Sequence, residues 1–109
     1  MSMDAVFKAL ADAVRRQLLD SLHARNGQTL GELCEAHDMT RQAVMKHLVI
    51  LETANLVVTQ KRGREKLHFL NPVPIHDIAD RWISKYERER LRALSDLNKA
   101  LDGTNDRQH

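Results

Sequence analysis

The sequence predicts a mainly α-helical fold with one β-hairpin. Three observations predict it: apolar residues at helical spacing in five segments, helix-capping residues ahead of several of these, and two short β-prone runs flanking a glycine. With 109 residues, of which 42% are hydrophobic and 29% charged, the chain fits one globular domain. We expect that domain to span residues 1–102 and a disordered tail to occupy residues 103–109.

Two amphipathic helices are predicted before residue 28. The first covers about residues 5–10, where apolar side chains recur at helical spacing. Asp12 then provides a fresh N-cap for the second helix, which we expect to end near residues 26–27. Arg15 and Arg16 are expected on the outer face of this second helix.

A short helix, a tight turn and a capped helix follow. Glu32 lies three residues after Thr29, which is the spacing of a capping box at the start of a Thr29–His37 helix. Thr40 caps the next helix, Thr40–Thr53. Two helices joined by a few residues form a helix-turn-helix, whose second helix fits the major groove of DNA.

The outward positions of the Thr40–Thr53 helix carry side chains that suit DNA. Hydroxyl and amide groups can hydrogen-bond to phosphates or base edges, and cations can pair with phosphates or guanine acceptors. A methionine thioether can contact a thymine methyl group. The residues concerned are Thr40, Arg41, Gln42, Met45 and Lys46.

The runs Val57–Gln60 and Leu67–Leu70 predict an antiparallel hairpin, with Gly63 in the turn of the segment that joins them. This segment, Lys61–Lys66, is called the wing below. Four like charges within six residues repel one another, so a nearby polyanion would relieve the repulsion. The wing cations are Lys61, Arg62, Arg64 and Lys66. A helix-turn-helix followed by such a hairpin is a winged helix-turn-helix.

The positive charge of the chain is concentrated in its middle block. Residues 40–66 have a balance of +4, residues 1–39 a balance of −2, and residues 67–109 are neutral. The whole chain therefore carries only +2, but a localised basic surface is what phosphate binding requires.

A long last helix is predicted from Pro74, a residue that suits a first helical turn, to about Leu101. One stripe of it offers more apolar surface than one thin domain can easily cover, which favours a homodimer. The alternative is that the stripe packs only on its own domain. The stripe consists of Ile75, Ile78, Ala79, Trp82, Ile83 and Tyr86, and it is continued by Leu91, Leu94, Leu97 and Leu101.

The ordered set of motifs resembles the arsenical-resistance-repressor (ArsR) family, in its stand-alone subgroup without an evident metal site. The matching stretches lie within residues 5–86 and include Ala9–Asp12, Leu30–Leu33, Thr40–Leu48, Gly63–Glu65 and Leu70–Pro72. Ala13 departs from the family, which usually has proline there. His47 resembles a common family histidine, and we expect it to have a structural hydrogen bond.

The resemblance implies a homodimeric repressor that binds double-stranded DNA at an inverted-repeat operator. It also implies that the first and last helices form the two-fold interface. The residues expected there are Val6, Leu10, Ile75, Ile78, Trp82, Ile83 and Tyr86.

Metal sensing must be considered, because many relatives of this family are metal sensors. The arsenic and cadmium type has a Cys-x-Cys pair where this chain has Thr29 and Gly31. Cys34 is expected to be a small core residue. His76 and Asp80 are i, i+4 neighbours that could bind zinc if doubled by symmetry, but a solvated helix start is the favoured interpretation. We expect no metal and no cofactor.

The leading hypothesis is therefore a sequence-specific DNA-binding repressor. A metal- or ligand-responsive sensor of the same fold and a protein-interaction winged helix remain alternatives, and the identity of any small-molecule effector is open. We expect no enzyme, because the sequence has no Gly-rich phosphate loop and no paired nucleophile and base. The single cysteine and the lack of a signal-peptide pattern or membrane-spanning run lead us to expect a cytoplasmic protein without a membrane partner.

Overall fold

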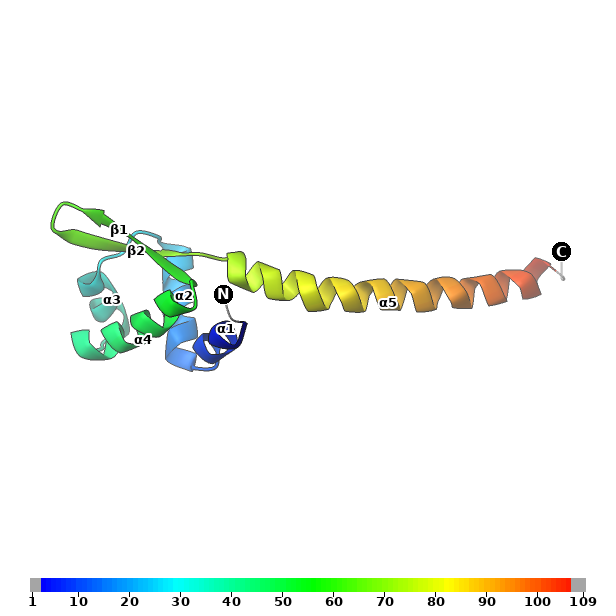
Figure 1. Cartoon of the computed structure of the whole chain (residues 1–109), viewed down its shortest axis with the longest axis horizontal. Helices are drawn as coiled ribbons and strands as arrows, with labels where there is room; N and C mark the ends of the chain where they lie inside the picture. Colours follow the sequence, from blue (N-terminus) through cyan, green and yellow to red (C-terminus); the bar gives the residue numbers. More distant parts are fainter. Residues whose placement is uncertain (1–2, 107–109) are drawn as a thin grey trace. The chain divides into compact units, whose positions relative to one another are not determined.

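The structure, a computed structural model, describes residues 3–106 and the side chains of residues 3–102. Within these residues it contains five α-helices and a two-stranded antiparallel sheet, which confirms the predicted fold class (Figure 1). The chain divides into two units, residues 1–76 and 77–109, and each is described by itself. Among the described residues, no helix has the length and apolarity needed to cross a membrane.

Helices α1 (Met3–Leu10) and α2 (Ala13–Ala24) begin the first unit. Asp12 is the N-cap of α2, as predicted, and its Oδ1 accepts hydrogen bonds from the backbone N–H groups of Val14 at 2.8 Å and Arg15 at 3.2 Å. Helix α2 ends slightly earlier than expected, at Ala24.

The prediction that Arg15 lies on an outer face is wrong, since only 11% of its side chain is exposed. Its Nε donates to Ala9 O at 2.8 Å and its Nη2 donates to Lys8 O at 2.9 Å. These two carbonyls belong to the last turn of α1 and have no partner within that helix. The Nη1 of Arg15 lies 3.4 Å from Nδ1 of His47 on α4, consistent with the structural hydrogen bond expected of His47. Arg16 is exposed, as predicted.

Helix α3 (Leu30–His37) begins with the predicted capping box. The backbone N–H of Glu32 donates to Thr29 Oγ1 at 3.2 Å, and the N–H of Thr29 donates to Glu32 Oε1 at 3.1 Å. The helix ends where Asp38 adopts the left-handed conformation, with φ 49°. Three residues, 38–40, therefore connect α3 to α4.

Helix α4 (Arg41–Thr53) has the predicted boundaries. At its start, Thr40 Oγ1 accepts a hydrogen bond from the backbone N–H of Ala43 at 3.2 Å. Just after its end, Asn55 adopts the left-handed conformation, with φ 60°, which prevents the helix from continuing. Its inner face contributes Val44, Leu48 and Leu51 to the core. The rest of the core comes from α1, α2, α3 and the chain after α4: Val6, Ala9, Leu18, Leu19, Leu22, Leu33, Ala54, Leu56 and Val57.

The strands β1 (Val57–Arg62) and β2 (Glu65–Leu70) are longer than predicted. The expected six-residue connection is wrong, because residues 61, 62, 65 and 66 continue the ladder and leave a two-residue turn of Gly63 and Arg64. Gly63 has φ 62° at the first central position, which a type II′ hairpin turn requires.

The base of the hairpin is fastened to the loop between α2 and α3 by two buried polar residues, Gln28 and His68, each 3% exposed. His68 N–H donates to Gln28 O, and Gly27 N–H donates to His68 O, both at 2.8 Å. His68 Nδ1 lies 2.9 Å from the same Gln28 carbonyl oxygen. The Gln28 side-chain amide donates to the carbonyls of Ser21 and Arg25 at 2.9 Å. Because the polar groups are paired, they can be buried at little cost.

Helix α5 (Val73–Asp106) starts after Asn71, whose Oδ1 accepts from the N–H of Val73 at 3.3 Å. Pro74 occupies the first turn, as predicted. The helix passes the expected end at Leu101. Of the segment expected to be a disordered tail, residues 103–106 belong to α5, and residues 107–109 lie outside the described residues.

Candidate nucleic-acid interface

The outer face of α4 is polar, cationic and exposed. Because Val44, Leu48 and Leu51 hold the opposite face in the core, the outward residues project from a rigidly held helix. The five predicted contact residues of this helix are all exposed: Thr40, Arg41, Gln42, Met45 and Lys46. The Thr40 hydroxyl already serves as the N-cap acceptor of α4.

The hairpin presents its cations on two faces rather than one. Lys61 is paired directly with Lys66 across the ladder, and Arg62 is paired with Glu65. Side chains alternate along a strand, so both lysines share the face of the buried His68, which is turned toward the helices. Arg62 shares the opposite face with Glu65. The lysine pair places like charges side by side, an arrangement that a phosphate between them would stabilise.

Lys66 connects the wing to α4. Its Nζ lies 3.4 Å from Oε1 of Glu52, which is in the last turn of α4. The side chain of Lys66 is 58% exposed, so this ion pair is solvent-screened and worth little by itself. It shows that the first residues of β2 lie beside the last turn of α4. Glu52 was missed as a member of this surface because nothing in the local sequence links it to residue 66.

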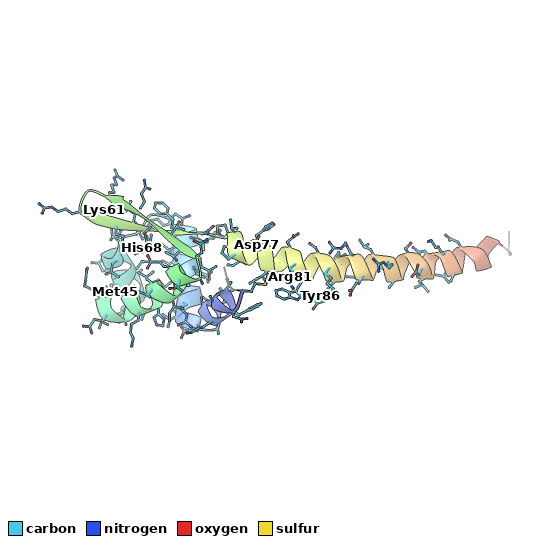
Figure 2. All side chains as sticks on the ribbon, viewed as in Figure 1. Met45, Lys61, His68, Asp77, Arg81 and Tyr86 are labelled. Atoms are coloured by element: carbon cyan, nitrogen blue, oxygen red, sulfur yellow. The ribbon has the colours of Figure 1, made fainter. Side chains whose placement is uncertain are left out.

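A cleft with a volume of about 460 Å³ lies between α4, the start of α3 and β2. Arg41 of α4 lines it together with Arg64 and Lys66 of the wing, and two carboxylates, Glu52 and Glu65, and His68 also line it. Figure 2 shows His68 on the side of the hairpin that faces the helices, Met45 on α4 and Lys61 on the hairpin near its turn. The helix and the wing therefore contribute cations to one continuous concave surface.

Two carboxylates cap helix N-termini in this unit: Asp12 at α2 and Glu32 at α3. The pKa of Glu32 lies below its usual value, chiefly because the N–H of Thr29 donates to it and also because Arg25 lies 2.8 Å away. The pKa of Asp12 is lowered mainly by the backbone N–H of Arg15. Both carboxylates are therefore stabilised in the charged form by the folded structure.

The residues expected at a subunit interface differ in exposure. Val6 is 2% exposed in the core of its own unit, which leaves little of it for a partner, and Leu10 is half-buried. On α5, Ile78 and Trp82 are half-buried, and the Arg81 guanidinium lies 5.3 Å from the centre of the Trp82 ring. Figure 2 places Tyr86 on the same helix. The exposed members are Ile75, Ile83 and Tyr86.

The residues considered for sensing differ in exposure and contacts. Cys34 is half-buried, and Asp80 Oδ1 accepts a hydrogen bond from Ser84 Oγ at 3.2 Å. His76 is exposed. Within the described part of the chain, no group of three or more His, Cys, Asp or Glu side chains could hold a metal ion.

Comparisons with known proteins agree with this geometry. Residues 10–60 match the model of a helix-turn-helix domain family. The chain is 42% identical over 86 residues to the HTH-type transcriptional regulator YuzN of Bacillus subtilis, covering 73% of this chain and 94% of YuzN. It is 31% identical over 75 residues to the transcriptional repressor SdpR of the same species, covering 69% of this chain and 82% of SdpR.

A solved structure extends the agreement to nearly the whole chain. The ArsR-like transcriptional regulator from Rhodococcus sp. RHA1 has a TM-score of 0.73 and 29% identity, and the match covers 93% of this chain and 91% of that one. Regulators of this kind are not enzymes, in agreement with the sequence analysis. The chain belongs to the ArsR family of winged helix-turn-helix transcriptional regulators.

Proposed function

We propose that this regulator is a homodimeric repressor that binds an inverted-repeat operator through α4 and the wing. The observation that carries the proposal is the cleft shared by Arg41, Arg64 and Lys66, because it joins the outer face of α4 to the wing in one surface where these three cations outnumber the two carboxylates of Glu52 and Glu65. DNA offers both phosphates for these charges and base edges for the groove-facing side chains.

The two elements would divide the work of recognition. Gln42 and Lys46 stand on the exposed face of α4, where they can reach base edges in the major groove. The wing cations Lys61, Arg62 and Arg64 suit phosphates or an adjacent minor groove, so they would add affinity with little dependence on sequence. Lys66 would also pair with a phosphate, with part of its charge already offset by Glu52.

Dimerisation would place two copies of α4 on one duplex. The exposed side chains of Ile83 and Tyr86 on α5 offer apolar surface for a second copy. A two-fold dimer positions its recognition helices about one DNA turn apart, which explains why an inverted repeat is expected. The likeness to SdpR, a transcriptional repressor, favours repression. Binding to chromosomal DNA would place the protein in the cytoplasm of a bacterial cell.

The direct test is selection of bound sites from random duplexes with the purified protein. We expect an inverted repeat to be enriched. On that site, Gln42→Ala should weaken binding by roughly 1–3 kcal/mol while leaving affinity for random duplex nearly unchanged. Arg64→Ala should weaken both duplexes alike and lower the salt slope by about one unit. Failure to enrich any sequence, together with salt-independent binding, would contradict the proposal.

A further inference from the structure

An apolar pair interrupts the polar outer face of α4. Met45 and Val49 are 51% and 58% exposed, although they lie four residues apart on a helix whose neighbouring outward residues include Gln42 and Lys46. Both line the cleft beside the wing, and both also line a second, shallower hollow of about 380 Å³ on the other side with Gln42 and Lys46. They therefore form a ridge between two concave surfaces.

We propose that the Met45–Val49 ridge reads thymine methyl groups in the major groove, and that these contacts help to select the operator. The inference rests on the proposed function and adds a chemical criterion to it. Thymine alone among the four DNA bases presents a methyl group in the major groove, so an apolar contact there is specific for it. Val49 becomes a specificity residue that the sequence analysis did not assign.

The surroundings of the ridge favour DNA over an apolar protein partner. Arg41 and Arg64 line the cleft on one side, where the carboxylates are Glu52 and Glu65, and Lys46 lines the hollow on the other side. An apolar partner that covered the ridge would also bury these charges without partners, which is costly. A major groove supplies methyl groups at its floor and phosphates along its edges, so it satisfies the ridge and the cations together.

The spacing of the two side chains limits which methyl groups they can reach. Residues four apart on an α-helix are separated by about 6 Å along its axis. Base pairs in a duplex are about 3.4 Å apart. Met45 and Val49 should therefore contact thymines at neighbouring positions, up to about two base-pair steps apart in each half-site.

The test replaces each thymine of the selected operator with deoxyuridine, which removes the methyl group and keeps every hydrogen-bonding group. Affinities are measured by fluorescence anisotropy. For the unchanged protein, deoxyuridine at one or two positions per half-site should weaken binding about fourfold each, which is the value of one buried methyl group. Met45→Ala or Val49→Ala should weaken thymine binding and abolish the effect of deoxyuridine at its own position.

Lys46→Ala is the matched control. It should weaken thymine and deoxyuridine duplexes by the same factor, because its contact does not involve the methyl group. Circular dichroism melts of Met45→Ala and Val49→Ala should match those of the unchanged protein, since both side chains are exposed. Sequence-selective binding whose affinity is unchanged by deoxyuridine at every position would overturn this inference and leave the proposed function standing.

A change in oligomeric state caused by Met45→Ala without DNA would identify a protein contact at the ridge and would also overturn the inference. Absence of any duplex binding would overturn the proposed function as well.

Discussion

At the scale of single residues, Arg15 shows what a helical pattern leaves undetermined. Two successive arginines on α2 look alike in the sequence, and both reach carbonyls in the last turn of α1. Only Arg15 is mostly buried there, and only its guanidinium also reaches His47 on α4. The difference depends on where α1 turns back, which is set by tertiary packing. Capping residues such as Asp12 and Thr29 were predictable because their partners lie two or three residues away.

We predict that Arg15→Met lowers the free energy of unfolding by about 2 kcal/mol, because it keeps the aliphatic stem and removes the donors to the carbonyls of Lys8 and Ala9. Arg16→Met is the matched control. Its exposed side chain donates to Leu10 O, so the expected loss is about 0.5 kcal/mol or less. Urea denaturation at one fixed protein concentration measures both. Equal losses of unfolding free energy in the two variants would show that the buried hydrogen bonds of Arg15 to α1 add no more stability than the exposed one of Arg16.

A second prediction concerns Glu32, whose pKa is lowered in the folded protein chiefly by the N–H of Thr29. Because folding favours its charged form, its contribution is present above its ordinary pKa of 4.5 and is lost as the pH falls through its lower folded value. Glu32→Gln keeps an acceptor for the capping box and removes the titration. The melting temperature of the variant should fall less between pH 5 and pH 3 than that of the unchanged protein, as measured by circular dichroism.

If the variant and the unchanged protein lose the same number of degrees over that interval, Glu32 does not contribute to acid sensitivity. Asp12→Asn provides a comparison at the other stabilised helix start. Its carboxylate pKa is also lowered, so this variant should show a smaller acid-dependent loss too, in a range just below the ordinary value of 3.8.

At the scale of elements, helix ends were easier to predict than the extent of the hairpin. The boundaries of α4 follow from Thr40 and Asn55, which act locally. The ladder of β1 and β2 continues through charged residues that have low strand propensity, because each is paired with a residue on the opposite strand. That pairing is stabilised by the base of the hairpin, where His68 and Gln28 meet across 40 residues of sequence.

Two glycines in different elements should respond oppositely to alanine. Gly63 has φ 62° with no atom within 4 Å of an added Cβ, so Gly63→Ala should cost about 1 kcal/mol from backbone strain alone. Gly31 is helical, and its added Cβ would lie 3.9 Å from Thr29 Oγ1, an ordinary contact. Gly31→Ala should therefore stabilise the protein by about 0.5 kcal/mol. Urea unfolding compares them, and effects of the same sign would contradict the hairpin turn or the helix assignment.

At the scale of the whole molecule, the sequence does not determine how the predicted contact residues are distributed over the surface. A run of four wing cations looks like one cluster, yet strand alternation separates Lys61 and Lys66 from Arg62. Lys66 then approaches Glu52, a contact that only the packing of the hairpin beside α4 creates. The apolar ridge of Met45 and Val49 was not predicted as a unit, because the exposure of both side chains between two hollows depends on the fold.

Dimerisation through α5 gives the last prediction. Ile83 is 64% exposed in the chain, so Ile83→Asp costs a monomer little, whereas a charge buried in a subunit interface is strongly unfavourable. Light scattering should give twice the chain mass for the unchanged protein and the single chain mass for the variant. Affinity for the inverted repeat should fall on the order of a hundredfold, because the second half-site no longer gains from linkage.

Ser95→Asp, on the same helix but on the side away from the apolar stripe, is the control for a general effect of charge on α5, since Ser95 is also exposed. It should leave both the mass and the operator affinity unchanged. Binding to a single half-site separates dimerisation from DNA binding by one subunit, because the Ile83→Asp variant should bind a half-site as well as the unchanged protein does. A variant that stays dimeric, or that loses half-site binding too, would mean that Ile83 does not lie in the interface that pairs the two DNA-binding units.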